Sequence, residues 1–434
     1  MDAKRSMPAG KRKLLVFFPG YLLLLLLHLL VFNPAFSQST VKDLGDVMPF
    51  GKKASDTIQG SEIVVGKIIY SLLPIVGYAP ANGFVFGSAV SLARLFGIPP
   101  TRLSSGMLNF QITTKRQFII NARSKIYLTG NKWFMQGDWR MLFFTQPTYG
   151  LGVVSSTSET MHLGVNNLPQ ITIPQAEQLK YNHLRIYEEV VRRLWESNVY
   201  AGIGLAMDQH FSIVDERLDT VGPDVYMTNH YAYSLKNNFS SSGYGTNGLK
   251  MTLLLDKRDN IINCYHGYYA SASVQYNLKI KGNSQESTQF LYDARYYLGL
   301  DKSSNRHLLA FWSWGSFLLN GNVPYLALPS IGWDTYNRSG RGYIQGRFRG
   351  LSMVYNEAEY RFPISKNGLL GGVVFVNATN ASNFDESLFE KAAIGCGAGL
   401  RVMFDKSART NLTVDFGLGS DHSGGIYLNL QEAF

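Results

Sequence analysis

Apolar and polar residues alternate along segments of about ten residues after residue 40, and this alternation limits the fold more than any other feature. Near the end of the chain Leu412, Val414, Phe416 and Leu418 take every second position, and the residues between them are polar or glycine. The last segment repeats the pattern with Ile426, Leu428, Leu430 and Phe434. Successive side chains of a strand point to opposite faces, whereas a helix would spread these residues around its axis. The segments are therefore predicted to be strands with one apolar and one polar face.

The length of these segments favours a membrane barrel over a soluble sandwich. About ten residues span a bilayer as a tilted strand, and no later apolar run approaches the 18 or so residues of a membrane helix. The chain holds 25 Tyr, 26 Phe and 42 Gly, yet its mean hydropathy is only -0.06. A barrel combines these values because one strand face meets lipid and the other a polar lumen. We expect an all-β, transmembrane antiparallel β-barrel over residues 63–434.

The alternation places sixteen strands, an even number that closes an antiparallel barrel with both ends on the periplasmic side. Short polar turns join some of them, and the alternate connections 145–180, 209–246, 320–349 and 379–391 are long. Two interpretations stay open for 209–246, a single loop or a further hairpin near Tyr226–Leu235. The strands are expected at 63–75, 83–93, 103–113, 117–129, 132–144, 181–191, 196–208, 247–258, 266–279, 287–299, 306–319, 350–362, 369–378, 392–404, 408–418 and 423–434.

The first residues have the composition of a secretory signal peptide. Five basic residues precede an apolar run over 14–32, and Ala35-Phe36-Ser37 forms a small-x-small cleavage site. The alternative, an uncleaved membrane helix, is opposed by Pro19-Gly20, which interrupts the run. We expect a signal peptide at 1–37, a short periplasmic segment at 38–62, and location in the outer membrane of a Gram-negative type of cell.

The positive charge of the chain is partly a property of this leader. The whole chain has a formal net charge of +10, and residues 1–37 contain five basic residues and Asp2, so removing them lowers the charge by four to +6. This charge suits the anionic phosphates of outer-membrane lipids and lipopolysaccharide, or is ordinary scattered surface charge. Basic residues do not interleave with stacking aromatics, so no nucleic-acid partner is expected.

No arrangement of residues predicts catalysis, a metal or a cofactor. The eight histidines show no i, i+4 pair and no cysteine at metal-ligand spacing, so no zinc site is expected. The glycines of Gly340–Gly346 have the wrong spacing for a dinucleotide loop, and no βαβ unit surrounds them. Cys264 is placed in a turn and Cys396 in a strand, so the two are not expected to pair. The chain is not expected to be an enzyme.

Three motifs resemble, in order along the chain, those of the BamA/TamA and two-partner-secretion transporter superfamily, also called the bacterial surface antigen family. The first is the Asp256, Arg258, Asp259 turn before Gly267-Tyr268. The second joins Pro324–Tyr343 and Gly346–Gly350 to the strand Glu357–Pro363. The third is Gly397–Arg401 together with the terminal Phe434. The resemblance covers residues 63–434 and implies the barrel of that family.

The resemblance also implies that the long sixth loop folds into the lumen, where Arg341 meets Glu359. Gly340 and Gly342 would let the tip, which ends in Tyr343, approach the wall closely, and a confined guanidinium needs an anionic partner. The open alternative is that Arg341 is an exposed loop charge. The next strand has Val376-Asn377-Ala378 where the family commonly has an aspartate, so a second acidic partner is without a counterpart there.

Family members that insert or secrete proteins carry periplasmic POTRA modules of about 75 residues, and none fits between Gln38 and the first expected strand. The first functional hypothesis is outer-membrane protein assembly or polypeptide translocation, alone or in a larger complex, through a weak seam between the first and last strands. The alternative is a passive pore or structural barrel whose loop constricts the lumen. An enzyme in the lumen is the weakest hypothesis, because no nucleophile–base pair is visible. Phe434 is expected to be the last lipid-facing residue and part of the terminal strand signal.

The signal peptide generates the first prediction. Protein from purified outer membranes should begin at Gln38, because the cleavage site directly follows the apolar run. Mass spectrometry of the N-terminal peptide measures this. An intact Met1 on a chain recovered from the inner membrane would contradict it.

Overall fold

The computed structural model describes residues 41–47, 65–98, 100–153, 160–161, 171–172, 177–195, 197–221, 226–280, 284–301, 306–406, 409–420 and 423–434. Residues 41–434 form one compact unit. The predicted signal peptide, residues 1–37, lies outside the described residues, as does most of the predicted segment 38–62. Among the described residues no helix is long and apolar enough to cross a membrane.

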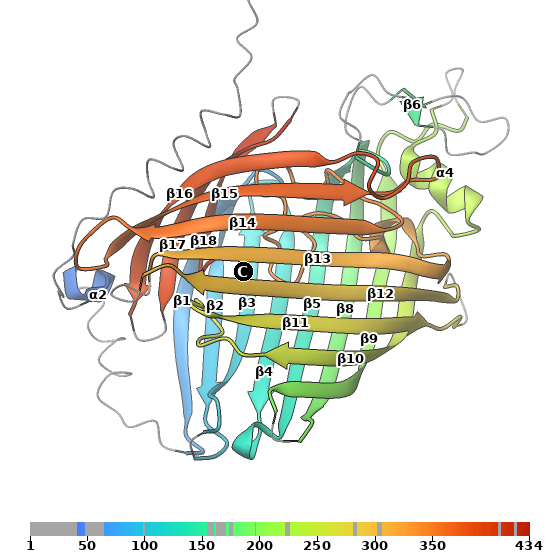
Figure 1. Ribbon diagram of the computed structural model, residues 1–434. Coiled ribbons are helices and arrows are strands. Elements are labelled where there is room, and N and C mark those ends of the chain that lie inside the picture. The colour runs from blue at the N-terminus through green and yellow to red at the C-terminus, as the bar shows by residue number, and fades with distance from the viewer. Residues whose placement is uncertain are drawn as a thin grey trace, which may run out of the picture. The chain divides into compact units, whose positions relative to one another are not determined.

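Sixteen antiparallel strands close into a barrel (Figure 1), as the alternation predicts. The order around the ring follows the chain, and the barrel closes where β1 meets β18. β5 is the neighbour of β8 because β6 (Thr160–Met161) and β7 (Ile171–Thr172) form a separate two-stranded sheet. The barrel strands are β1 (Ile68–Ala79), β2 (Gly83–Arg94), β3 (Ser104–Thr113), β4 (Phe118–Tyr127), β5 (Trp133–Thr148), β8 (Glu177–Arg193), β9 (Val199–Asp215), β10 (Gly243–Asp256), β11 (Gly267–Asn277), β12 (Ser287–Gly299), β13 (Leu308–Gly321), β14 (Met353–Pro363), β15 (Leu370–Ala381), β16 (Ala393–Asp405), β17 (Thr410–Leu418) and β18 (Gly424–Leu430).

Exposure alternates along the strands as the sequence predicts. On β17 the apolar residues Leu412, Val414, Phe416 and Leu418 are exposed, while Asn411, Thr413 and Asp415 between them are buried. The outward face is therefore apolar and the lumen is polar. The polar face carries the charged residues described below.

The connections differ in length between the two ends of the barrel. At the turn end β14 and β15 are joined by residues 364–369, and β16 and β17 by 406–409. At the loop end the connections 149–176, 216–242, 322–352 and 382–392 are long. The short helix α2 (Leu44–Val47) contacts β16 near the turn end, where Asp43 Oδ2 accepts from the Lys406 N–H at 3.2 Å. This end-to-end asymmetry is typical of membrane barrels.

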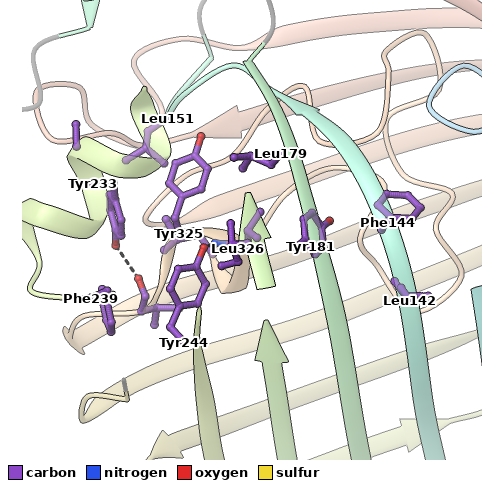
Figure 2. Close-up of a cluster of buried hydrophobic side chains, with 14 of the residues drawn as sticks. Leu142, Phe144, Leu151, Leu179, Tyr181, Tyr233, Phe239, Tyr244, Tyr325 and Leu326 are labelled. Carbon is purple, nitrogen blue, oxygen red and sulfur yellow. Dashed lines mark hydrogen bonds between the residues drawn. The ribbon is translucent and has the colours of Figure 1, made fainter. Parts of the chain in front are cut away.

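The possible hairpin near Tyr226–Leu235 is wrong, because the segment forms the helix α4 (Asn229–Lys236). The Thr228 hydroxyl caps this helix by accepting from the Tyr231 N–H at 3.3 Å. Figure 2 shows Tyr233 of α4 facing the 3-10 helix η3 (Tyr325–Ala327), and the Tyr233 hydroxyl donates to the Val323 carbonyl at 2.7 Å. A local period-2 pattern cannot reveal this contact with a distant loop.

Most strand boundaries differ from prediction by up to four residues, and two differ by more. β1 begins at Ile68, five residues after the predicted start at 63, and β9 continues to Asp215, seven residues beyond 208. The extension of β9 is paired on both sides. Its last pair with β10 is Phe211↔Gly243, and its last pair with β8 is Asp215↔Leu179. The extension contains Ser212 at φ +53°, and its register against β8 shifts between Lys180 and Asn182, so its side chains do not keep the strict alternation that marks the other strands.

The seam between β1 and β18 is the weakest junction of the barrel. All twelve residues of β1 pair with β2, but its register with β18 contains the single Cα pair Tyr78↔Leu428. By contrast, β17 pairs with β18 from Leu412↔Leu430 to Leu418↔Gly424. Residues 68–75 of β1 extend beyond the last residue of β18 in this register, so on the β18 side their backbone edge has no strand partner among the described residues.

Candidate functional site

The long connection 322–352 between β13 and β14, here called the lumen loop, folds into the barrel. Arg140 on β5 donates to the Asn337 side chain at 3.0 Å, and Gln146 on β5 donates to the Gln345 carbonyl at 3.3 Å. On the opposite side the Gly342 N–H donates to the Tyr427 hydroxyl of β18 at 3.0 Å. The lumen loop therefore crosses the interior between distant parts of the wall.

The tip of the lumen loop requires glycine on both sides of Arg341. Gly340 has φ +81° and Gly342 has φ +106°, a backbone conformation that side chains with a Cβ rarely adopt. A Cβ on Gly342 would lie 2.6 Å from the Leu418 carbonyl oxygen. The tip can therefore press against β17 only where the side chain is absent.

Arg341 enters a buried cluster of carboxylates. Its Nη2 lies 2.5 Å from Glu357 Oε1 and also contacts Glu359, while its Nη1 lies 2.7 Å from Asp415 Oδ2. The guanidinium also stacks on the Phe375 ring at 3.7 Å from the centroid. All four charged side chains are almost fully buried, so each depends on the others to offset its lost hydration.

Two further arginines extend this cluster toward the C-terminus. Arg361 Nε lies 2.6 Å from Glu359 Oε2, and Arg401 Nη1 lies 2.5 Å from Asp415 Oδ1. Arg401 Nε also lies 2.7 Å from Glu432 Oε2. The network joins β14, β16, β17 and the chain end through the lumen, with the arginine of the loop tip among its members.

Residues 376–378 lack the aspartate that the resemblance led us to look for, and the structure shows which groups bind Arg341 in its place. Asn377 does not provide a negative charge, but its amide donates to the Arg341 carbonyl at 2.9 Å. The further acidic partners of the arginine are Glu357 on the same strand as Glu359 and Asp415 on β17. The expected gap in the acidic network is thus filled from other inward positions.

Tyr343 fixes the tip on its other side. Its hydroxyl donates to the Ile394 carbonyl at 2.6 Å and accepts from the Ser420 N–H at 2.9 Å. Its ring packs edge-on against Phe348 with centroids 4.8 Å apart. The motif residues 340–343 therefore contact β14, β15, β16, β17 and β18.

The expectation that Phe434 faces lipid is wrong. β18 ends at Leu430, Gln431 has φ +79°, and the last residues turn into the lumen, where Phe434 is 6% exposed. The Phe434 ring lies 5.3 Å from that of Trp312 on β13 and 6.0 Å from that of Tyr297 on β12. The reason is the charge on Glu432, which binds Arg401 and the Asn411 amide, at 2.7 Å each, inside the barrel.

The Asp256, Arg258, Asp259 motif organises the turn end. Asp256 forms a two-pronged contact with Arg258, at 3.0 Å for each prong, and also binds Arg102 of the β2–β3 turn at 3.2 Å. Asp259 pairs with Arg409 of the β16–β17 turn. Burial alone would raise the pKa of Asp259, but Arg409 and the Cys264 thiol outweigh burial and hold that pKa below its ordinary value.

Cys264 and Cys396 are both free thiols, as expected. The Cys264 thiol donates to Asp259 at 3.0 Å, and burial together with this carboxylate raises the pKa of the thiol to about 12. Cys264 therefore stays protonated and packs as part of the turn.

Two histidines that are distant in sequence become neighbours in the wall. His183 of β8 and His210 of β9 are direct cross-strand partners, and Asp208 lies two residues before His210 on the same inward face. An i, i+4 spacing brings side chains together on a helix, so it does not reveal a pair formed across two strands. The i, i+2 spacing of Asp208 and His210 gives no signal either, because the strand expected from the sequence ends at 208 and leaves His210 in the connection 209–246.

For the Arg341 cluster, the strands expected from the sequence do contain the signal, because alternate residues of a strand share one face. Glu357, Glu359 and Arg361 share one strand face, as do Asn411, Thr413 and Asp415. Charged residues at inward positions must be paired to be buried. The alternation therefore identifies candidates, but not which carboxylate meets which arginine across the lumen.

The cluster predicts a non-additive mutant cycle. Replacing Arg341 with Ala should cost roughly 3 to 5 kcal/mol of stability, because carboxylates are left buried without their partner. Glu359→Gln should also destabilise, and the double variant should be less harmful than the sum of both. Arg341→Lys should rescue poorly, since an ammonium cannot make the planar two-pronged contact. The urea midpoint of the barrel, followed by its heat-modifiable gel mobility, measures these changes.

Lys180→Ala provides the matched control, because the ion pair of Lys180 with Glu216 has a lysine side chain that is 57% exposed. An exposed pair of this kind is worth less than about 1 kcal/mol. Additive effects of that small size at Arg341 and Glu359 would show that the buried cluster does not hold the loop.

The inward tail predicts that Phe434 stabilises the finished barrel. Phe434→Ala should cost about 3 to 5 kcal/mol, the usual range for truncating a buried Phe, and should lower the urea midpoint. Phe416→Ala is the control, because Phe416 is 52% exposed on the outer face of β17. Equal midpoints for the two variants would count against the buried position of Phe434.

Comparison with known proteins places this geometry in a family. The Omp85 superfamily domain matches residues 207–434, more than half of the chain. None of the curated proteins matches the sequence. The match includes β10 to β18, the lumen loop and the whole Arg341 cluster.

Solved structures share the barrel at low sequence identity. BamA from Haemophilus ducreyi, lacking POTRA domains 1–3, is 14% identical, with a TM-score of 0.52 over 84% of this chain and 70% of that one. CdiB from Escherichia coli is 8% identical, with a TM-score of 0.55 over 86% of this chain and 63% of that one, so less than two thirds of it is spanned. The likeness concerns the fold. The matched domain and the shared barrel confirm the resemblance drawn from the motifs, and the chain is an outer-membrane β-barrel protein of the Omp85 superfamily.

Proposed function

We propose that this barrel acts in outer-membrane protein assembly or polypeptide translocation by offering the free edge of β1 to a client strand. The observation that carries the proposal is the single Cα pair between β1 and β18. An unpaired strand edge is a template on which another chain can add by backbone hydrogen bonding.

The outer face of β1 suits an incoming strand in a membrane. Tyr70, Leu72 and Val76 lie on this face and are 70 to 77% exposed, more than most outward residues of the fully paired strands. Pro74, which lacks an N–H group, lies in the same stretch and is tolerated in an edge strand. A client strand could therefore form backbone hydrogen bonds along β1, except at Pro74, which has no N–H to donate.

The contacts of the chain end explain why the seam is incomplete. Arg338 of the lumen loop donates to the carbonyls of Leu430 and Gln431, at 2.6 and 2.8 Å, and to that of Glu432. These carbonyls follow or end β18, so the loop draws the chain away from β1. The lumen loop thereby controls how much of the β1 edge is free.

Family membership supports the proposal at the level of the barrel, and the client and the partners are part of the proposal. Assembly or secretion components of the outer membrane are the expected protein partners, and the apolar outer face contacts outer-membrane lipids and lipopolysaccharide. Cleavage after Ser37 would release the mature chain for insertion.

Site-specific photo-crosslinking tests the proposal directly. A photoreactive phenylalanine analogue at Tyr70, on the free edge, should capture nascent outer-membrane or secreted polypeptides in living cells. The same analogue at Tyr276 is the matched control, because Tyr276 is also outward and exposed but lies on β11, which pairs with β10 and β12. Mass spectrometry identifies the captured chains.

Crosslinks to polypeptide clients from Tyr70 but not from Tyr276 support the proposal. If both positions capture only lipid while the barrels are correctly folded, the proposal fails, and ion conductance of the purified barrel then decides for the passive pore. Heat-modifiable gel mobility verifies the fold of both variants.

A further inference from the structure

A second group of polar residues lies inside the barrel wall, apart from the Arg341 cluster. Within the described residues, His183, Asp208 and His210 are the group of three metal-ligating side chains whose donor atoms all lie within 4.8 Å of one another. All three side chains are almost fully buried. The group stands on paired strands, so its backbone positions are fixed by the β8–β9 ladder.

We propose that His183, Asp208 and His210 form a binding site for a divalent transition-metal cation of the zinc class. The donors are two imidazole nitrogens and one carboxylate oxygen, a set that zinc accepts in sites with three protein ligands and one open position. The proposal is independent of the β1–β18 seam.

The unpaired nitrogen of His210 is the observation that points to a ligand. Its Nδ1 has no hydrogen-bond partner among the described residues, although the side chain is only 3% exposed, and it lies 3.8 Å from Asp208 Oδ1. A buried polar atom without a partner is costly in a folded protein. A cation between the imidazole and the carboxylate would satisfy this nitrogen.

Two side chains must rotate before the three donors can share one ion. His183 Nε2 lies 2.5 Å from Asp208 Oδ1, closer than two ligands of one ion, while His210 Nδ1 lies 3.8 Å from the same oxygen, slightly farther than two such ligands. Tetrahedral ligands at about 2.0 to 2.1 Å from zinc are roughly 3.3 Å apart. The two rings are stacked with centroids 4.3 Å apart, so opening the His183–Asp208 contact makes room for the ion between the three donors.

The second carboxylate oxygen of Asp208 is held by the surrounding wall. Oδ2 accepts from Arg185 Nε at 2.9 Å and from the Tyr187 hydroxyl at 3.0 Å, which leaves Oδ1 directed at the two histidines. Hydrogen bonds of this kind orient metal-binding carboxylates. Arg185 also brings a positive charge close to the ion, so the same contact weakens binding electrostatically.

Aromatic rings from three segments enclose the site. Trp333 of the lumen loop packs edge-on against His183 with centroids 5.7 Å apart, and Tyr181 and Tyr244 lie 5.5 and 5.9 Å from the His210 ring. The cation would therefore bind beneath the lumen loop. Binding of the cation would therefore change the surroundings of the Trp333 ring, which packs against His183.

Metal titration of the intact barrel tests the site. The mature chain is purified in detergent without a histidine tag and mixed with Zn²⁺ alone, and the ion retained after desalting is quantified by mass spectrometry. One equivalent of Zn²⁺ per barrel is expected. His210→Ala and Asp208→Asn should each weaken binding by at least about 10 to 100-fold, the range found when only a supporting residue of a metal site is lost.

Two further variants separate a metal ligand from a residue that only packs. His230→Ala removes another buried histidine of the same region, one whose Nε2 bonds the Tyr244 hydroxyl, and should leave Zn²⁺ affinity unchanged. Arg185→Gln removes the competing positive charge and keeps an N–H donor for Asp208 Oδ2, so it should tighten binding where a merely structural role would give no such gain. Heat-modifiable mobility verifies that each barrel is folded.

Quenching by a paramagnetic ion gives an independent reading of position. Cu²⁺ should quench the Trp fluorescence of the barrel, and Trp333→Phe should remove most of the quenched signal because this ring is next to His183. No retained Zn²⁺, or retention that His210→Ala does not reduce in a folded barrel, would overturn the proposal.

Discussion

The buried contact of Arg341 with three carboxylates is the interaction on which the arrangement of the lumen depends. The Arg341 side chain is 4% exposed, and its partners Glu357, Glu359 and Asp415 are equally buried. These charges stabilise one another, because each alone would lose its hydration without compensation. The contact therefore fixes a long loop inside the barrel. Gly340 and Gly342 make this possible by letting the loop backbone lie against β17.

The same loop connects the lumen to the seam. Arg341 sits among side chains of β14 and β17, and Arg338, three residues earlier, binds the carbonyls at the end of β18. Glu432 then joins the tail to Arg401, which shares Asp415 with Arg341. The position of the loop, the inward tail and the short β18 are thus parts of one hydrogen-bonded network, and the free β1 edge follows from it.

Much of the fold could be predicted because the bilayer imposes a pattern on every strand. Residues such as Val414 and Phe416 must be apolar where lipid is outside, and this requirement is visible at period two. The prediction fails in three places: β9 runs on to Asp215, α4 replaces a possible hairpin, and the tail leaves the wall at Gln431. In each case a contact with a distant segment decides the structure, and no local period records it.

Some residues of the site could be predicted from the sequence, and others could be found only from the structure. Arg341 and Glu359 could be named from their motif, and the structure brings them together, whereas Asp415, Arg401 and Glu432 depend on which strands face each other across the lumen. The His183–His210 pair is an example within the wall, since only the β8–β9 register brings the two histidines together. The alternation along a strand shows which residues can point into the lumen, and the arrangement of the strands decides which of these residues meet.

In the resting barrel the β1 edge facing β18 is free. Hydrogen–deuterium exchange of the purified barrel in lipid nanodiscs tests it most directly, by comparing the amides of residues 68–75 with those of 249–255 on β10, a strand paired on both sides. The β1 peptide is expected to exchange far faster, because about half of its N–H groups point toward an edge without a partner strand. Equal protection of the two peptides would show that the seam is closed and that β1 offers no free edge.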